Sequence, residues 1–140
     1  MLLTIEKVAV LKSADIFART PDHVLASVAG IVEEVDVTPG ETFIHEDKME
    51  TEMYVIVEGE VRVHKNATDI TTFGPGAVVG EMETLAPAAR AASVSAVSET
   101  RLFRIPKDAF DEVMADRPEI AQGVIRVLVE RLRAETMSRG

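Results

Sequence analysis

The spacing of the apolar residues changes twice along the chain, and this change limits the folds that the chain can adopt. Between Val32 and Pro106, apolar and polar residues alternate in short runs, a pattern typical of β-strands with one buried face. Turn-forming motifs such as Thr38-Pro39-Gly40 and Gly74-Pro75-Gly76 separate the runs. The main expected strands cover residues 35–37, 43–45, 54–57, 61–63 and 102–105. Many short strands at this spacing predict a β-sandwich or jelly roll.

Apolar residues at helical spacing precede and follow this region. Thr20 is the expected N-cap of a helix whose first position is Pro21, and Pro118 opens the longest helix. The apolar helical positions are Ile5, Val8 and Leu11, then Val24, Leu25, Val28 and Ile31, then Ala109, Phe110, Val113 and Met114, and finally Ile120, Val124, Val127, Leu128 and Leu132. The sequence therefore predicts an α+β fold, a β-jelly roll (double-stranded β-helix) flanked by N-terminal helices and a C-terminal helix pair.

One domain is expected to fill residues 1–140. It divides into a helical lead-in at residues 1–31, the jelly roll at 32–106 and the C-terminal helices at 107–137. Only eight residues follow Leu132, which is too few for a helix-turn-helix. We therefore expect the chain to act through a partner, through self-association, or as part of a larger protein.

Charge and composition exclude several classes of protein. Lys and Arg number 15 against 24 Asp and Glu, and the net charge of -9 argues against binding nucleic acid through its phosphates. No apolar run approaches the ~18 residues of a membrane span. The first residues carry Glu6 and Asp15 and lack an Ala-x-Ala site, so no secretory signal is expected. The absence of cysteine excludes disulfides and thiol catalysis, and it suits a cytoplasmic location.

Acidic residues crowd one part of the expected jelly roll. Residues 33–60 hold ten acidic side chains, with Lys48 as the single lysine. We interpret this stretch as a solvated acidic hairpin.

The stretch from Gly76 to Val94 has the residues that could bind an anion. It leaves a strand at Val78-Val79, turns at Gly80, forms a short helix near residues 81–85 and returns to a strand at 92–96. A glycine before a helix start exposes backbone N–H groups that suit a phosphate. The Arg90 guanidinium could bind two phosphate oxygens, and Glu81 could accept a hydrogen bond from a sugar hydroxyl. The combination favours a phosphorylated sugar.

Several motifs together resemble the cyclic nucleotide-binding domain, the module of catabolite activator proteins, protein kinase A regulatory subunits and cyclic nucleotide-gated channels. The Glu81-to-Arg90 spacing of nine residues resembles the phosphate-binding cassette of that family, here expected at residues 79–92. The supporting motifs, in the family's order, are Pro39-Gly40-Glu41, Tyr54-x-Ile56-x-x-Gly59-x-Val61, Gly76-x-x-x-Gly80-Glu81 and Arg90-x-Ala92-x-Val94.

The resemblance implies a role for each cassette residue. Glu81, with the Gly80 backbone, would meet the ribose 2′-hydroxyl, and Arg90 would pair with the cyclic phosphate. Backbone N–H groups of Glu83 and Ala91 would complete the phosphate site, and Met82 belongs to the same expected ligand-binding set. A threonine after the arginine favours guanine in the family. Ala91 stands there instead, so cAMP is the preferred ligand and cGMP the second candidate.

Three positions depart from the family pattern: Glu83 replaces a small or apolar residue, Ala89 a frequent proline, and Asp47-Lys48 a turn with glycine. A carboxylate at ~5 Å from a phosphate costs about 0.8 kcal/mol in water and about 3 kcal/mol at an effective dielectric constant of about 20. Glu83 therefore opposes the ligand unless it points away. The alternative for Arg90 is a salt bridge to Glu81 or Glu83.

Enzymatic alternatives have weaker support. His45, Asp47 and Glu52 have spacing similar to the first metal-binding motif of cupins, but Gly80-Glu81 stands where the second motif needs a histidine. Ser93 and Ser95 fall in a strand pattern, and no Gly-x-Ser-x-Gly motif occurs. We expect no metal, no cofactor and no catalysis. The expected function is a regulatory sensor domain that binds a cyclic purine nucleotide through residues 80–90. The alternative is a ligand-free protein-interaction or dimerisation domain.

The C-terminal helix is a candidate lid for such a ligand. Its stripe of Val124, Val127, Leu128 and Leu132 is apolar enough to pack on the jelly roll, and Gly123 gives local freedom near its start. An ordinary docked helix and a dimer interface are the alternatives.

Overall fold

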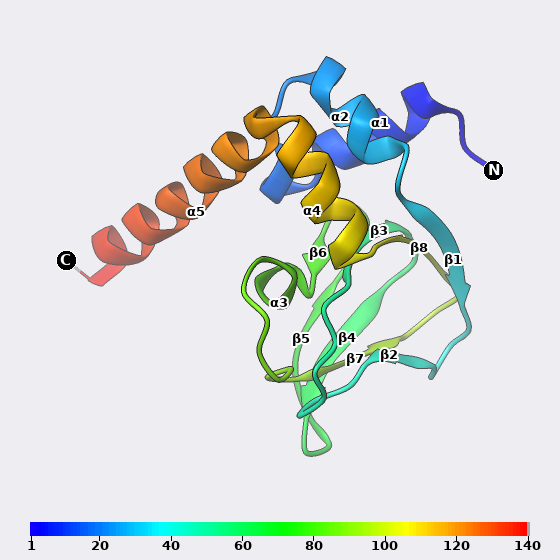
Figure 1. Cartoon of the computed structure of the whole chain (residues 1–140). Coiled ribbons are helices and arrows are strands. Elements are labelled where there is room, and N and C mark those ends of the chain that lie inside the picture. Colours follow the sequence, from blue (N-terminus) through cyan, green and yellow to red (C-terminus); the bar gives the residue numbers. More distant parts are fainter. Residues whose placement is uncertain (140) are drawn as a thin grey trace.

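Two four-stranded antiparallel sheets form the centre of the molecule in the computed structural model, which describes residues 1–139. One sheet has the strand order β1-β8-β3-β6 and the other β2-β7-β4-β5 (Figure 1). The strands are β1 (Glu33–Val37), β2 (Thr42–Ile44), β3 (Met53–Glu58), β4 (Val61–Lys65), β5 (Thr68–Phe73), β6 (Val78–Val79), β7 (Ser93–Ala96) and β8 (Thr100–Ile105). The expected jelly roll and α+β class are confirmed.

The strand β5 is the one that the hydrophobic pattern did not predict. All six of its residues are exposed, so the strand has no buried face to produce an alternating pattern. It pairs with β4 through a turn in which Asn66 and Ala67 have positive φ, of 50° and 67°. Backbone pairing at the sheet edge holds this strand.

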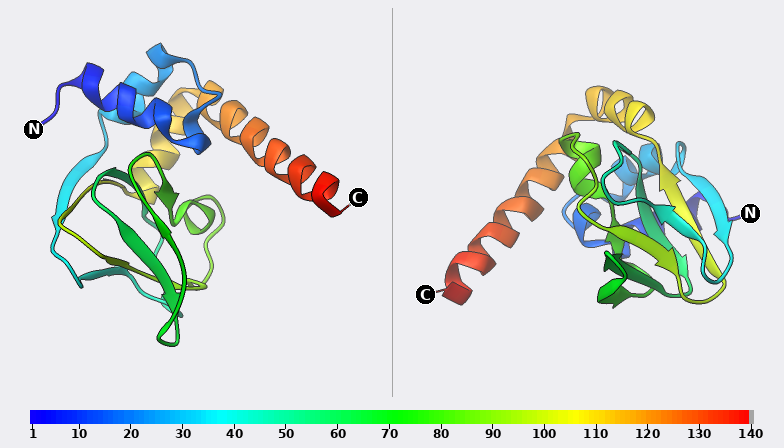
Figure 2. Two further views of the ribbon diagram at one scale, coloured as in Figure 1. Left: turned by 180° about the vertical axis from the view of Figure 1, so that it is seen from behind. Right: turned by 90° about the horizontal axis from the view of Figure 1, so that it is seen from below.

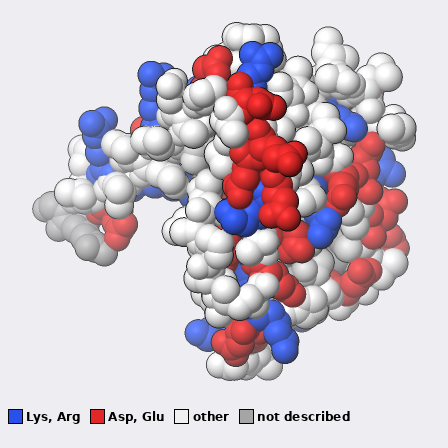
Figure 3. Space-filling view, in the orientation of Figure 1, with Lys and Arg blue, Asp and Glu red and all other residues white. Residues whose placement is uncertain are grey.

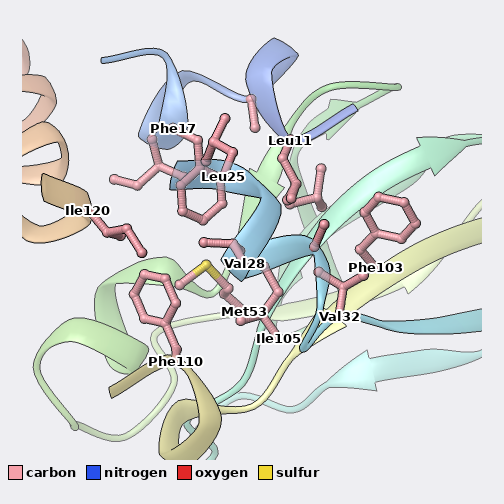
Figure 4. Close-up of a cluster of buried hydrophobic side chains, with 14 of the residues drawn as sticks. Leu11, Phe17, Leu25, Val28, Val32, Met53, Phe103, Ile105, Phe110 and Ile120 are labelled. Carbon is pink, nitrogen blue, oxygen red and sulfur yellow. The ribbon is translucent and has the colours of Figure 1, made fainter. Parts of the chain in front are cut away.

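The sheet that contains β3 and β8 has an apolar core on each face. On β3, Tyr54 and Ile56 face the second sheet, while Met53 and Val55 face the helices. The helix-facing core includes Leu11, Phe17, Leu25, Val28, Phe103, Ile105, Phe110 and Ile120 (Figure 4). Successive side chains of β3 therefore point alternately into the two cores, as the alternating pattern in the sequence requires.

The helices gather at one end of the jelly roll. They are α1 (Thr4–Ser13), the 3₁₀ helix η1 (Asp15–Phe17), α2 (Asp22–Ala29), α4 (Lys107–Asp116) and α5 (Pro118–Arg139), and the short α3 (Glu81–Leu85) lies in the jelly roll. The expected cap of α2 is wrong by one residue, because Pro21 is the N-cap. Thr20 instead closes the preceding turn, its N–H donating to the Phe17 carbonyl. Its Oγ1 is buried without a hydrogen-bond partner.

The helix α5 packs differently from the expected stripe. Val124 and Val127 are buried in the core beneath the N-terminal helices, and α5 contacts η1, α2 and α4. Leu132, however, is 62% exposed, and the end of α5 extends away from the body (Figures 1 and 2). The first half of the stripe is therefore docked against the helical core, whereas Leu132 is not covered.

Gly123 allows α5 to approach the N-terminal segment closely. A Cβ at this position would lie 2.6 Å from Thr20 Oγ1 and 3.0 Å from the Arg19 carbonyl oxygen. Thr20 is fully buried, so it has little room to retreat. Gly30, by contrast, has an ordinary helical φ of -68° and would place a Cβ no closer than 3.5 Å to another residue.

We expect Gly123→Ala to lower the free energy of unfolding by about 1 kcal/mol or more. Overpacking lowers the free energy of unfolding by roughly 1–3 kcal/mol. The higher helix propensity of alanine offsets up to about 1 kcal/mol of this loss. Urea unfolding followed by circular dichroism measures the change, with Gly30→Ala as a matched control that keeps or slightly raises stability. Equal stability of Gly123→Ala and the original chain would contradict the close approach.

Candidate functional site

The segment between β6 and β7 forms a turn, a short helix and a loop that returns to the sheet. Gly80 has a φ of +83°, which favours glycine, and it is followed directly by α3. A Cβ on Gly80 would also lie 2.7 Å from Arg90 Nη1 and 2.8 Å from the Glu52 carbonyl oxygen. Both the backbone conformation and the lack of space for a Cβ therefore require glycine at position 80. The helix predicted near residues 81–85 is present as α3.

Arg90 is the central side chain of this segment and is only 1% exposed. Its Nη1 donates to the Gly80 carbonyl at 3.0 Å and to Glu83 Oε1 at 2.9 Å. Its Nη2 donates to the Glu52 carbonyl, while its Nε has no hydrogen-bond partner. The backbone is held as well, because the Arg90 N–H donates to the Lys48 carbonyl at 2.9 Å. The guanidinium is thus fixed in position, and its Nε–H remains without a hydrogen-bond acceptor.

Carboxylates surround this buried cation. Besides Glu83, Glu50 Oε1 lies 3.7 Å from Arg90 Nε and Glu52 Oε2 lies 3.9 Å from Arg90 Nη2. Burial opposes ionisation of Glu52, but hydrogen bonds to its own backbone N–H and to Arg104, together with the charges of Arg104 and Arg90, lower its pKa overall. The solvated acidic hairpin was therefore a wrong interpretation for Glu50 and Glu52, which are partly buried at Arg90.

Elsewhere acidic residues do cover the surface. Figure 3 shows acidic side chains spread over several regions of one face, with fewer lysines and arginines among them.

Glu81 contacts the C-terminal helix, and its ion pair is with Arg131 and not with Arg90. Arg131 Nη1 on α5 lies 3.4 Å from Glu81 Oε1, and Arg131 Nη2 lies 2.7 Å from Asp15 Oδ2. Burial raises the pKa of the Glu81 carboxyl, and the Arg131 charge opposes this shift. The alternative of a salt bridge from Arg90 to Glu81 is not what forms; the partner is Glu83.

A cavity of about 250 Å³ lies between the sheets and this segment. Its walls are mostly apolar and its polar residues gather at the cassette, an arrangement typical of small-molecule sites. The lining residues are Ile44, Val63, Phe73, Val78, Val79, Gly80, Glu81, Glu83, Arg90, Ala91, Ala92 and Val94.

Five of the six residues expected to bind a ligand line this cavity: Gly80, Glu81, Glu83, Arg90 and Ala91. Met82 does not line the cavity and is 58% exposed on α3. No pattern in the sequence indicated Phe73, which comes from the exposed strand β5, or the approach of Glu50 and Glu52 to Arg90. Such contacts depend on which strands become neighbours.

The histidines considered for a metal site have other partners. His45 Nδ1 lies 2.8 Å from Glu50 Oε2, and His64 Nε2 lies 2.7 Å from Ser95 Oγ. Within residues 1–139, no group of three or more metal-binding side chains comes together.

None of the helices within residues 1–139 is both long enough and apolar enough to cross a bilayer.

Comparison with known proteins gives consistent matches. Residues 34–117 match the family described as the cyclic nucleotide-binding domain. A CRP-like cAMP-activated global transcriptional regulator from Mycobacterium tuberculosis is 31% identical over 129 residues, covering 89% of this chain and 58% of the regulator. Lysophospholipase NTE1 from Phaeosphaeria nodorum is 30% identical over 108 residues, which are 74% of this chain and 7% of the enzyme. The chain therefore spans less than two thirds of these relatives.

Solved structures show the same fold. The N-terminal domain of a transcriptional regulator from Streptomyces coelicolor A3(2) superposes with a TM-score of 0.84 at 26% identity, covering 94% of this chain and 95% of that one. The regulatory domain of Toxoplasma gondii PKA, solved with cAMP, has a TM-score of 0.72 at 24% identity, covering 79% of this chain and 44% of that one.

Proposed function

The chain belongs to the cyclic nucleotide-binding domain family, and from this we propose that it is a non-catalytic regulatory module whose ligand is a cyclic purine nucleotide, with cAMP preferred to cGMP. The observation that carries the proposal is the buried Arg90, which lines the cavity and has an Nε without a hydrogen-bond partner. A buried, unpaired donor of a cation is costly unless an acceptor reaches it. A phosphate oxygen is such an acceptor.

The remaining cavity residues suit the other parts of a cyclic nucleotide. In this proposal the ribose hydroxyl donates to Glu81, and the base lies against apolar walls such as Val63 and Val94. Ala91 offers no hydroxyl to a guanine amino group, which supports cAMP. The matched relatives support binding rather than turnover, since the matched region is 58% of a regulator named for cAMP activation and only 7% of the lysophospholipase.

A ligand-free interaction domain is the second candidate, and two observations favour it. Glu83 already occupies Arg90 Nη1, so the cassette has an internal partner in place of a ligand. The outer face of α5 exposes Ile125, Val129 and Leu132 at helical spacing, which would suit a second copy of the chain or a protein partner. For either candidate we place the module in the cytoplasm, which suits its lack of cysteine, and without direct nucleic-acid contact, which its net charge of -9 opposes.

Isothermal titration of the full chain with cAMP and cGMP separates the two candidates. We expect both nucleotides to bind, with cAMP tighter, and Arg90→Ala to weaken binding about tenfold or more, because a charge-assisted hydrogen bond contributes roughly 1.5–3 kcal/mol. Arg90→Lys should also bind more weakly, since lysine lacks the planar fork. Arg101→Ala is the control, because Arg101 pairs with exposed Asp36 on another surface.

Absence of binding of either nucleotide to the original chain would favour the ligand-free candidate. Unchanged affinity in both Arg90 variants would overturn the assignment of the site.

The contact between Glu81 and Arg131 offers a route from the ligand to α5. A ribose hydroxyl that donates to Glu81 would compete with Arg131 for the same carboxylate. The ligand could therefore favour one position of α5 over another. We expect hydrogen exchange in residues 118–136 to slow when cAMP binds. Arg131→Ala should remove this response, whereas Arg126→Ala, at an exposed position of the same helix, should keep it. Identical exchange with and without saturating cAMP would show that α5 is purely structural.

A further inference from the structure

Glu83 already binds the Arg90 guanidinium, to which the proposed function assigns a phosphate. Its side chain is 19% exposed, lines the cavity and accepts a hydrogen bond from Arg90 Nη1 at 2.9 Å. The second hydrogen of Nη1 goes to the Gly80 carbonyl at 3.0 Å. Both donors of Nη1 are therefore used within the protein. Nη1 therefore has no hydrogen left to donate to an added anion.

The charges around Arg90 also oppose a second anion. Glu83, Glu50 and Glu52 approach the guanidinium at 2.9, 3.7 and 3.9 Å. Arg104 is shared between Glu52, at 3.0 Å, and Glu33, and Glu50 also contacts His45 at 2.8 Å, so four carboxylates face two arginines and one histidine. The polar end of the cavity is thus not a positive site while Glu83 stays in place.

From this arrangement we infer that Glu83 is an internal counterion of Arg90, which orders the cassette in place of a phosphate and must be displaced before a cyclic nucleotide binds. The displacement of Glu83 by a nucleotide rests on the proposed function. The ordering of the cassette by Glu83 rests on the ion pair between Glu83 and Arg90.

The structure lets Glu83 move without unfolding its helix. The neighbouring Thr84 anchors α3, since its Oγ1 donates to the Thr51 carbonyl at 2.6 Å and its own carbonyl accepts from Lys107 Nζ at 2.9 Å. Neither anchor involves the Glu83 side chain. Rotation of one partly exposed side chain therefore suffices to free Nη1 for a ligand oxygen.

The inference predicts that loss of the Glu83 carboxylate has two separate effects. In titrations with cAMP, Glu83→Ala and Glu83→Gln should bind about tenfold tighter or more, which corresponds to about 1.4 kcal/mol. Without any nucleotide, hydrogen exchange in residues 80–92 should be faster in Glu83→Gln, because Arg90 has lost its counterion. Glu41→Gln removes the same charge at an exposed loop and should change neither quantity.

The outcomes distinguish the inference from the proposed function. Equal nucleotide affinity of the original chain and both Glu83 variants would overturn the displacement while leaving nucleotide binding intact. If neither the original chain nor the variants bind cAMP or cGMP, the proposed function fails and displacement fails with it. The exchange measurement then decides the counterion role alone: faster exchange supports it, and unchanged exchange overturns it.

Discussion

The burial of one guanidinium determines how the cassette is built. Arg90 is 1% exposed, and a cation so placed is stable only when carboxylates and carbonyls surround it. The carbonyls of Gly80 and Glu52 supply two acceptors, and the carboxylate of Glu83 supplies the third. Gly80 must lack a side chain because Arg90 Nη1 takes the space of its Cβ. This one side chain therefore joins the turn before α3, through Gly80, to the residue before β3, Glu52.

Two ion pairs hold the residues that a cyclic nucleotide would contact. Arg90 is paired with Glu83 within the cassette, while Glu81 is paired with Arg131 from α5. A ligand would therefore have to replace these partners as well as reach the unpaired Arg90 Nε, and each replacement lowers the net gain from binding. The second pair also joins the cavity to the helical core. Regulation of α5 by the cavity, if it follows the proposed function, passes through that contact.

Much of the fold could be predicted from the sequence because local pattern and burial agree. The period of two located the main strands, and the glycine before residues 81–85 located the cassette. The edge strand β5 escaped prediction because none of its residues is buried. The first helical turn at Pro21 was misplaced by one residue, since Thr20 serves the preceding turn instead.

The candidate site was predictable only in part, for a different reason. The spacing from Glu81 to Arg90 identified the side chains, but it left open which carboxylate pairs with the arginine. The direction of residues on the short helix α3 decides this, placing Glu83 on Arg90 and Glu81 on Arg131. Glu50 and Glu52 come from a distant part of the chain, and no local pattern indicated that they would reach Arg90.

A double-mutant cycle on unfolding free energies tests most directly whether Arg90 and Glu83 form the interaction on which the cassette depends. The cycle compares Arg90→Met, Glu83→Gln and the double variant with the original chain in urea, without nucleotide. We predict a coupling free energy of about 1 kcal/mol or more, within the range of roughly 0.5–3 kcal/mol known for residues that share a network. Additive effects of the two substitutions would contradict the account.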